Sequence, residues 1–551
     1  MENWHLAASS VDYFAASDGP SPVRHYWSLS VEEQFYLAWP LVFAALGRRR
    51  RTLIAALAIL AAASCAYSIA FTAADPVRAY FVTPTRVWEL AAGGLLACVP
   101  AARSATVGAV ASWLGVVAIS AAAWNYDAST PFPGVAAVLP VAGALAVIWA
   151  GTPTSFLRSV ALQRLGDISY PVYLWHWPLL VFAPFATGLP VDTLTTLAVL
   201  MLTLLAAWLT KLLIEDPIRS SPLRPRWTFA CAGAATLAVL GVATSGSVRL
   251  QHDLHASEVA THRLLASQPD CFAAAARDPE RPCENPKLRR SVVPSPIEAH
   301  KQRNSPCPPL ERRGLLYVCG FGVDPARAST TVALIGDSHA AHWRAAIDRV
   351  ARERGWAGVS ISHTGCPLSK ATKNLPQPRR SQCVEWNRQV LRWLARHREV
   401  TTVFLGQISG GAGVIAPGRD QLAAQRDGYV RAWRALPPSV TRAFVLRDTP
   451  KMRGDTDTCV QRELDRRRRA DLQCRVPRRS ALSEDSAAVA GKRLRSPRVS
   501  VVDLTRLFCD RSFCPPVIGG ALVYKDQNHM TETWTRSLAP YVSRAIGGSG
   551  S

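Results

Sequence analysis

Long apolar stretches, rich in Ala, Leu and Val, follow one another through the first half of the chain and are separated by short polar connections. Several of them approach the roughly 20 residues that a helix needs to cross the hydrocarbon core of a bilayer. We predict eight spanning helices, approximately at residues 33–46, 52–71, 80–99, 106–124, 132–150, 168–185, 194–213 and 227–245. After about residue 250 the pattern changes, and two domains that face different solvents are the simplest interpretation.

Charge in the short connections orients these helices, because cytoplasmic loops are enriched in Lys and Arg. One side holds Arg48 to Arg51, Arg103, Arg158, Arg164, Arg219, Arg224 and Arg226, and the other holds only Arg78, Asp75 and Asp127. The Arg-rich side is therefore predicted to be cytoplasmic, with the first 30 residues and everything after about residue 250 outside. No signal peptide or earlier helix precedes this outer start, so we expect upstream spans, odd in number, to be missing from the chain.

The net charge of +23 is divided unequally between the two halves. Residues 251–551 carry 48 Lys or Arg against 28 Asp or Glu, whereas residues 1–250 carry 15 against 12. A basic domain can bind nucleic acid, but outside the cell we expect anionic lipid headgroups and acidic glycans as partners, and no nucleic acid. The alternative is a basic surface that is merely solvated.

Ten of the thirteen cysteines lie in the second half, because Cys65, Cys98 and Cys231 belong to apolar stretches. Ten is an even number, and the ten residues are neighbours two by two along the chain, as in a disulfide framework of an oxidising compartment. The predicted pairs are Cys271–Cys283, Cys307–Cys319, Cys366–Cys383, Cys459–Cys474 and Cys509–Cys514. Zinc binding is the alternative, but no CxxC spacing occurs.

Ionisable residues occur at the edge of, or inside, the predicted spans. Glu32 and Glu33 stand where an outer polar stretch passes into a helix. Charged groups near hydrocarbon usually line a cavity or form pairs, and they mark a functional site by default. The alternative is an ordinary helix start, where the helix dipole favours carboxylates.

Two further groups lie within the spans. Arg86 and Glu89 are three residues apart and share one helical face, so we expect them to pair. A structural ion pair and a contact with substrate are both open interpretations. His176 is the only histidine within a predicted span, and functional and structural roles are equally open.

The second half holds a candidate nucleophile. The stretch from Thr331 has the pattern of a buried strand, and a Gly turn then places Ser338 at the start of a helix. A serine at such a turn is exposed at the carboxyl edge of a parallel sheet, where a helix amino terminus can stabilise an oxyanion. Near the end of the chain, Asp526 and His529 have the spacing of an acid–base dyad. We predict that Ser338, His529 and Asp526 form a catalytic triad.

Three groups are candidates for the oxyanion hole of this triad. The backbone N–H of Ser338 is one, and that of Gly365, in a turn, is another, although Gly365 can also be a plain turn glycine. After the predicted strand 401–405, Gln407 could donate an amide N–H from its side chain. Its absence from the site would imply a weaker oxyanion hole.

These motifs resemble two known families. The first is the integral-membrane acyltransferase family 3, whose members acylate carbohydrates of the bacterial surface. The stretch HYWSLSVEEQFYLAWP from His25 carries most of the likeness, supported by residues 3–14, TRVWELAAGG from Thr85 and LGDISYPVYLWHWP from Leu165. The family's motif positions fall here on Glu32, Glu33, Arg86, Glu89, Tyr173 and His176.

The family differs from this chain at its start. Similar members begin with an earlier helix that bears an Arg and a catalytic His, and nothing before residue 25 matches it. Members with a fused soluble domain have eleven spans, so eight spans plus three missing ones restore the count and a cytoplasmic start.

The second resemblance is to the SGNH-hydrolase superfamily, from about residue 331 to 545, with Gly336 to Ala340 as its first block and Asp526 to His529 as its last. Together the resemblances imply a multi-pass α-helical membrane domain followed by a soluble three-layer α/β/α, flavodoxin-like domain. The expected divisions are a membrane domain at 1–248, truncated at its start, a periplasmic linker at 249–330 and an SGNH-like domain at 331–551.

The resemblances also imply a function. We expect an O-acyltransferase of the bacterial inner membrane, with a periplasmic carboxyl-terminal domain, that uses acetyl-CoA as donor and no metal. The expected acceptor is an envelope carbohydrate such as lipopolysaccharide O-antigen or peptidoglycan. The alternatives are a carbohydrate esterase, in which water resolves the acyl-enzyme, and an exporter with a non-catalytic soluble domain, which inverted repeats would favour.

Overall fold

The computed structural model describes residues 2–9, 21–46, 49–127, 130–151, 156–187, 192–220, 225–302, 305–375, 377–409 and 413–547. The chain divides into two compact units, Met1–Arg226 and Trp227–Ser551, each described below by itself. The division falls about twenty residues before the expected boundary at 248, because the last apolar helix belongs to the second unit.

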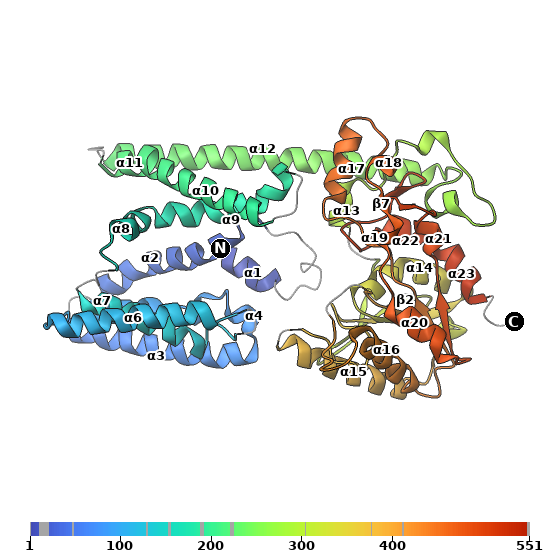
Figure 1. The fold of residues 1–551 in the computed structure, drawn as a ribbon, viewed down its shortest axis with the longest axis horizontal. Coiled ribbons are helices and arrows are strands. Elements are labelled where there is room, and N and C mark those ends of the chain that lie inside the picture. Colours follow the sequence, from blue (N-terminus) through green and yellow to red (C-terminus); the bar gives the residue numbers. More distant parts are fainter. Residues whose placement is uncertain are drawn as a thin grey trace. The chain divides into compact units, whose positions relative to one another are not determined.

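The first unit is entirely helical in its described part (Figure 1). Its helices are α1 (Glu2–Ser9), α2 (Trp27–Leu46), α3 (Arg50–Ala74), α4 (Pro76–Ala79), α5 (Val87–Leu96), α6 (Ala105–Asn125), α7 (Val138–Ala150), α8 (Val160–Asp167), α9 (Ser169–Thr187), α10 (Thr193–Thr210) and α11 (Asp216–Ser220), with a π-helical turn at Lys211–Glu215. Helix α6 packs on α7, α9 on α10 and α3 on α5. The α6–α7 contact requires glycine, since a Cβ on Gly115 would stand 2.5 Å from the carbonyl oxygen of Gly143.

Four helices within the described ranges are long and apolar enough to cross a membrane: Arg50–Ala74, Ala105–Asn125, Thr193–Ser220 and Arg226–Ala266. Val87–Leu96 and Val135–Ala150 are shorter apolar helices. The predicted continuous helix at 80–99 is wrong, because the chain forms a 3₁₀ turn at Thr83–Thr85 before α5 begins. Pro84 lies in that turn, and the Thr85 hydroxyl donates to the carbonyl of Ala79 (2.6 Å), so local hydrogen bonds replace a helical ladder.

The second unit is built on a seven-stranded sheet with the order β1-β2-β4-β3-β5-β6-β8. Strands β3, β4, β5, β6 and β8 are parallel, and β2 and β1 are antiparallel additions at the β4 edge. The strands are β1 (Pro309–Arg313), β2 (Leu316–Gly322), β3 (Thr330–Gly336), β4 (Trp356–Ser362), β5 (Val400–Gly406), β6 (Arg442–Leu446) and β8 (Val499–Val502). Short strands form two further ladders, β7 (Val476–Pro477) with β9 (Phe513–Cys514) and β10 (Val517–Ile518) with β11 (Ala521–Leu522).

Helices cover both faces of the large sheet (Figure 1). Side chains alternate along β3, so Val332 and Leu334 pack on one face with α14 (Ser338–Arg354), α22 (Glu532–Ser537) and α23 (Ala539–Gly547). Ala333 and Ile335 pack on the other with α15 (Arg379–Arg396), α16 (Gln421–Arg434) and α20 (Ser486–Leu494). The remaining helices of this unit are α12 (Pro225–Ala266), α13 (Pro296–Lys301), α17 (Thr456–Asp465), α18 (Ala470–Gln473), α19 (Arg478–Ala481) and α21 (Thr505–Phe508). The sheet thus has two helical layers, with parallel strands at its centre.

The segment expected as a linker, 249–330, contains ordered structure. Strands β1 and β2 lie in it and extend the sheet. Helix α12 continues to Ala266, and its hydroxyl groups Ser257 and Thr261 donate to one carboxylate oxygen of the buried Glu298 on α13 (2.7 and 2.8 Å). These bonds hold the end of α12 on the α/β unit.

The five cysteine pairs predicted from their neighbouring positions are at disulfide distance in the structure. Their Cα–Cα distances run from 4.1 to 5.9 Å, within the roughly 7 Å limit for bridging. Cys65, Cys98 and Cys231 are free.

Candidate functional site

Ser338 is the first residue of α14 and follows directly on the carboxyl end of β3. Asp337 caps this helix: one carboxylate oxygen accepts from the N–H of His339 and the other from the N–H of Ile408, both at 2.9 Å. The ends of β3 and β5 can meet so closely because Gly336 has no side chain; a Cβ there would lie 1.7 Å from the carbonyl oxygen of Gly406 on β5. Ser338 is half-buried, at the edge of the sheet where the sequence pattern predicts it.

His529 and Asp526 form a dyad in the loop before α22. The Nδ1 of His529 lies 2.7 Å from a carboxylate oxygen of Asp526, whose other oxygen accepts the N–H groups of Asn528 and His529. Burial raises the pKa of Asp526, but the hydrogen bonds and the charge of His529 outweigh it and lower the pKa to about 2. Asp526 is therefore ionised and fixes the Nδ1–H tautomer of its partner, which leaves Nε2 as the proton acceptor.

The dyad lies against the first turns of α14, although 191 positions of sequence separate Ser338 from His529. The imidazole of His529 is 4.9 Å from that of His339 and 5.9 Å from that of His342, measured between ring centroids. The loop after β6 holds the dyad in place, since the hydroxyl of Thr449 donates to the carbonyl of Asn528 (3.0 Å). The fold thus brings the segment that carries the dyad to the helix that begins with Ser338.

A second His–Asp pair lies beneath this site, and the sequence analysis missed it. His339 is 1% exposed, and its Nδ1 lies 2.5 Å from a carboxylate oxygen of Asp448. The other oxygen of Asp448 accepts from the N–H (2.6 Å) and the hydroxyl (2.8 Å) of Ser409. Burial alone lowers the pKa of His339, but the charge and hydrogen bond of Asp448, with smaller help from Asp337 and Asp526, raise it to about 9. His339 is a buried imidazolium at neutral pH.

His342, one turn further along α14, is its neutral counterpart. Both ring nitrogens are buried without a hydrogen-bond partner within the described ranges, and burial together with the nearby charges of His339 and His529 keeps its pKa well below the usual range. The signal for this cluster was visible in the sequence, because His339 follows the candidate nucleophile directly. The sequence signal for Asp448 was weaker, since its place after a strand is the only feature that marks it. Among the residues that the structure describes, no group of three or more His, Cys, Asp or Glu is arranged to hold a metal ion.

The two predicted oxyanion donors from other strands differ in position. Gly365 lies in a turn after β4, with φ of +67°, and the N–H of His363 in that turn donates to the carbonyl of Gly336 (3.0 Å). This bond places the turn beside the end of β3. The side-chain amide of the buried Gln407, by contrast, donates to the carbonyl of Leu446 (3.3 Å) and so joins the end of β5 to the end of β6.

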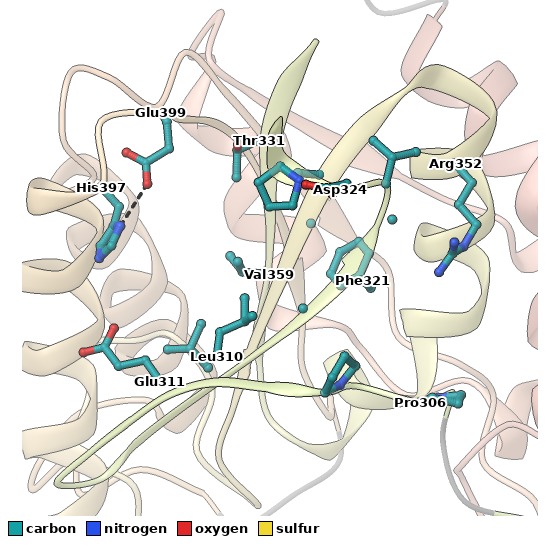
Figure 2. Close-up of a pocket in the computed structure, with 18 of the residues that line it drawn as sticks. Pro306, Leu310, Glu311, Phe321, Asp324, Thr331, Arg352, Val359, His397 and Glu399 are labelled. Carbon is teal, nitrogen blue, oxygen red and sulfur yellow. Dashed lines mark hydrogen bonds and ion pairs between the residues drawn. The ribbon is translucent and has the colours of Figure 1, made fainter. Parts of the chain in front are cut away.

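The pocket in Figure 2 does not belong to this site. It has a volume of about 580 Å³ and is formed by β1, β2 and the amino end of β3, with Phe321, Val359 and Leu310 among its lining residues. Thr331, which also lines it, stands at the opposite end of β3 from Ser338, roughly 20 Å away at the rise of a strand. We assign it no part in the chemistry of Ser338.

In the helical unit, Arg86 and Glu89 are paired as predicted, with Nη1 3.1 Å from Oε1. Arg86 is 9% exposed, and its guanidinium lies 4.8 to 5.4 Å from the ring centroids of Trp27, Tyr80 and Phe132. Such an aromatic cage stabilises a cation in an apolar setting. The cage and the carboxylate leave Arg86 well compensated, so the contacts support a structural pair and are also compatible with a substrate contact.

His176 and Tyr173 form a separate cluster on α9. The hydroxyl of Tyr173 donates to the carbonyl of His25 (2.5 Å), and the imidazole of His176 is 5.2 Å from that of His25. Neither ring nitrogen of His25 has a hydrogen-bond partner within the described ranges. The sequence analysis missed His25 as a site residue, although it opens the motif from His25 to Pro40.

Glu32 and Glu33 make no ion pair within the part of α2 that the structure describes, and Glu33 is exposed. The neighbouring motif residue Gln34, by contrast, forms hydrogen bonds with other elements. Its side chain donates to Asn3 on α1 (3.0 Å) and accepts from Thr83 (2.7 Å). Asn3 is fully buried, so this polar network joins α1, α2 and the turn before α5.

A helical unit with long apolar helices, joined to an α/β unit with a serine at a strand-to-helix turn and an Asp–His dyad, defines a class of protein that joins a membrane-type domain to a hydrolase-like one. Family comparisons agree with this class. Residues 2–212 match the model of an acyltransferase domain, and residues 303–544 match the SGNH domain that is fused to AT3 domains. The chain is therefore an acyltransferase-domain protein with a fused SGNH domain, and both resemblances predicted from the sequence are confirmed.

Three curated relatives illustrate the similarity. A putative peptidoglycan O-acetyltransferase of Bacillus subtilis is 30% identical over 248 residues, which cover 41% of this chain and 39% of the relative. An O-acetyltransferase of Staphylococcus aureus is 31% identical over 242 residues, 40% of each chain. A putative membrane-bound transacylase of Komagataeibacter xylinus is 32% identical over 213 residues, 38% of this chain and 54% of the relative. The chain thus spans about two fifths of the length of the first two.

Among solved structures, the periplasmic domain of a lipopolysaccharide acetyltransferase of Salmonella ser. Paratyphi A is similar with a TM-score of 0.32 and 13% identity. The match covers 41% of this chain and 89% of that domain. No argument rests on a likeness of this degree.

Proposed function

We propose that the protein is an O-acyltransferase that moves an acyl group, acetyl in the first instance, to hydroxyl groups of an envelope carbohydrate. The observation that carries the proposal is the Asp526–His529 dyad held against the start of α14, where Ser338 lies. The relatives named as O-acetyltransferases, one of them for peptidoglycan, support the choice of acyl group and acceptor class.

In the proposed reaction, the helical unit passes the acyl group outward from its cytoplasmic donor, and Ser338 Oγ attacks the carbonyl carbon of the acyl group that is presented to it while its proton passes to Nε2 of His529. The N–H groups of Ser338 and Gly365 donate to the oxyanion, and the Gln407 amide, one N–H of which donates to Leu446, has a second N–H as the third candidate donor. The donor's leaving group departs with the proton from His529, which leaves an acyl ester on Ser338. A sugar hydroxyl then attacks that ester, His529 takes its proton, and the same proton returns to Ser338.

The helical unit supplies the donor in this proposal. We place it in the bacterial inner membrane as a multi-pass domain with the SGNH domain in the periplasm, and we propose acetyl-CoA as the cytoplasmic donor. Its apolar helices and the five disulfides of the second unit support this placement, since disulfides persist in oxidising compartments. The residues proposed to contact the acyl group in the helical unit are those of the clusters around Arg86 and His176, together with Tyr173, Glu32 and Glu33.

The test follows label from the donor to the product. Membranes that hold the full chain are incubated with radiolabelled acetyl-CoA and envelope glycan, and label is measured as alkali-labile ester on the glycan. In parallel, hydrolysis of p-nitrophenyl acetate reports on the Ser338 site without the membrane step. We expect Ser338→Ala to abolish both activities. The matched control is Ser329→Ala, at an exposed serine just before the opposite end of β3, and it is expected to leave both activities unchanged.

Each outcome has a distinct meaning. Ester transfer that survives Ser338→Ala would contradict a covalent role for Ser338. Release of acetate to water, with no label on any glycan, would favour the esterase instead. A wild-type chain that transfers label only when upstream helices are added would locate the donor step in those helices and leave the SGNH chemistry intact.

A further inference from the structure

A hollow of about 590 Å³ in the second unit is lined by three arginines and no carboxylate. We name it the arginine pocket; its residues are Pro477, Arg478, Arg479, Leu482, Arg511, Ser512 and Phe513. Guanidinium groups that face one space and lack an acidic partner repel one another, so an anion in that space is stabilised.

The pocket has a fixed frame. Strand β7 pairs with β9, and the N–H of Arg478 donates to the carbonyl of Ser512 (2.8 Å). Asp510, the carboxylate that precedes Arg511 in the sequence, already has partners: one oxygen accepts the N–H groups of Ser512 and Phe513, and the other lies 3.5 Å from Arg277. The turn that carries Arg511 is thereby held by its own backbone, and the carboxylate does not neutralise the pocket.

The charges of the pocket are unpaired. Arg479 and Arg511 are exposed, and neither forms an ion pair with any carboxylate in the described ranges. Arginines close by in sequence behave differently, since Arg453 pairs with Asp455 and Arg469 with Asp471. What distinguishes the hollow is that three arginines line one space without an acidic residue among its lining residues.

The same hollow offers apolar surface. Leu482 and the Phe513 ring are half-buried in its wall, and the guanidinium of Arg475 lies 3.9 Å from the Phe513 ring centroid. Guanidinium forks recognise carboxylate and phosphate oxygens, and an aromatic or aliphatic wall suits the C–H face of a sugar ring. The combination fits an anionic sugar better than a neutral one.

The pocket is connected to the Ser338 site through the chain. Ser483 follows the pocket residue Leu482, and its hydroxyl lies 3.1 Å from that of Ser409. Ser409 in turn donates to Asp448, which holds His339 beside Ser338. A ligand in the arginine pocket is thus bound by a segment that ends at the candidate active site.

We propose that the arginine pocket is the acceptor subsite and that it binds a carboxylate or phosphate group of an anionic glycan. This inference rests on the proposed function, which it extends by stating that the acceptor is negatively charged. Among the possible anions we choose the glycan rather than a lipid headgroup, because the pocket connects to the Ser338 network.

The experiment compares two double variants of the full chain in detergent. Arg479→Gln/Arg511→Gln removes the unpaired charges, and Arg431→Gln/Arg434→Gln removes two exposed charges of α16 that likewise have no acid partner in the described part. Binding is measured for tetragalacturonate and for neutral maltotetraose, at two salt concentrations. We expect the pocket variant to lose about tenfold or more of its affinity for tetragalacturonate and to have a shallower salt dependence, while the α16 variant binds as wild type.

Further measurements distinguish the proposed acceptor subsite from its alternatives. Hydrolysis of p-nitrophenyl acetate is expected to be equal in all three proteins, because the small ester does not reach the pocket; its absence in wild type would count against the proposed function and not against the pocket. Equal loss in both double variants, or wild-type affinity in the pocket variant, would overturn the inference. So would displacement of tetragalacturonate by glycerophosphoglycerol at equal concentration, which would assign the pocket to lipid headgroups.

Discussion

At the scale of single residues, two His–Asp pairs lie side by side with different exposure. His529 and Asp526 are about one fifth exposed, whereas His339 and Asp448 are almost fully buried. An accessible pair can exchange protons with a substrate, and a buried pair keeps its charges fixed. We therefore assign proton transfer to the first pair and support of the site to the second.

Replacing Asp526 with Asn tests the first pair. The amide no longer fixes the His529 tautomer or stabilises its charged form, so we expect ester hydrolysis to fall by about 10³- to 10⁴-fold while some activity remains. Initial rates with p-nitrophenyl acetate measure this. The matched change Asp465→Asn, at an exposed position of α17, is expected to leave the rate unchanged. A rate close to that of wild type in Asp526→Asn would remove Asp526 from the mechanism.

Stability as a function of pH tests the second pair. The pKa of His339 rises from 6.5 to about 9 on folding, so its contribution is complete below about pH 6.5 and is lost as pH rises through 9. His339→Gln leaves the Asp448 charge without its partner, and we expect it to lower the free energy of unfolding by about 3 kcal/mol at pH 6.5 and to flatten the pH dependence.

Thermal unfolding between pH 6 and 9.5 measures this effect. His342→Gln is the control above about pH 7.5, where His342 is neutral in the folded state (pKa well below 6.5) and in the unfolded state (pKa 6.5), so its replacement leaves the slope unchanged there. An unchanged slope in His339→Gln would show that the His339 charge is not coupled to folding.

At the scale of the elements, the carboxyl end of β3, just before Ser338, depends on close backbone approach to the end of β5. Gly336→Ala places a methyl group against the carbonyl of Gly406 at a φ of +152°, so we expect a loss of about 3 kcal/mol or more together with loss of ester hydrolysis. Gly418→Ala, at a φ of +66° in open space, carries backbone strain alone and is expected to cost about 1 to 2 kcal/mol with activity retained. Denaturant titrations compare the two, and equal costs would refute the steric explanation.

The elements show which parts of the fold the sequence can predict. The β3–Ser338–α14 turn follows from a buried strand pattern next to a Gly and a capping Asp, all of which are local signals. The break at Thr83–Thr85 was missed because hydropathy averages over a window, whereas Pro84 and the Thr85 hydroxyl act within one turn. The edge strand β1 was missed because its exposed residues Glu311 to Arg313 have little apolar alternation. Strand β2 is largely buried and was missed because it lies inside the segment expected to be a linker.

The candidate site, too, could be predicted from the sequence only where its residues are close together in the chain. Residues within one motif, such as Asp526 and His529, could be placed together from their spacing. Asp448 could not, because its partner His339 is 109 positions away and only the parallel sheet brings the ends of β3 and β6 to one edge. The pairing of Gln407 with Leu446 likewise depends on neighbouring strands.

At the scale of the whole molecule, covalent cross-links are confined to the second unit. All five pairs lie between Cys271 and Cys514, and the three cysteines of the apolar helices are free. A disulfide commonly contributes about 2 to 5 kcal/mol. We expect dithiothreitol to lower the melting temperature of the SGNH unit strongly and to leave that of the helical unit unchanged.

Calorimetry of the full chain in detergent, with and without reductant, separates the two transitions. Thiol labelling of the unreduced protein under denaturing conditions is the control, with three reactive cysteines expected. A shift of both transitions would show that the units unfold together, and thirteen reactive thiols in the unreduced protein would contradict the disulfides.

Because Ser257 and Thr261 are bonded to Glu298, the number of residues that precede them in α12 determines where this bonded turn lies along the helix. In the proposed topology the apolar part of this helix ends near Ser245, and the helix continues without a break to the anchored turn. Each residue between these points adds about 1.5 Å of height and about 100° of rotation. The stretch therefore sets both the length, about 18 Å along the helix, and the rotation between the apolar part of α12 and the turn that is bonded to Glu298. A one-residue insertion rotates the bonded turn by about 100° relative to the apolar part of α12, whereas seven residues lengthen the stretch by about 11 Å with the rotation nearly restored. Evolution of this stretch is thus expected to proceed by whole turns of helix.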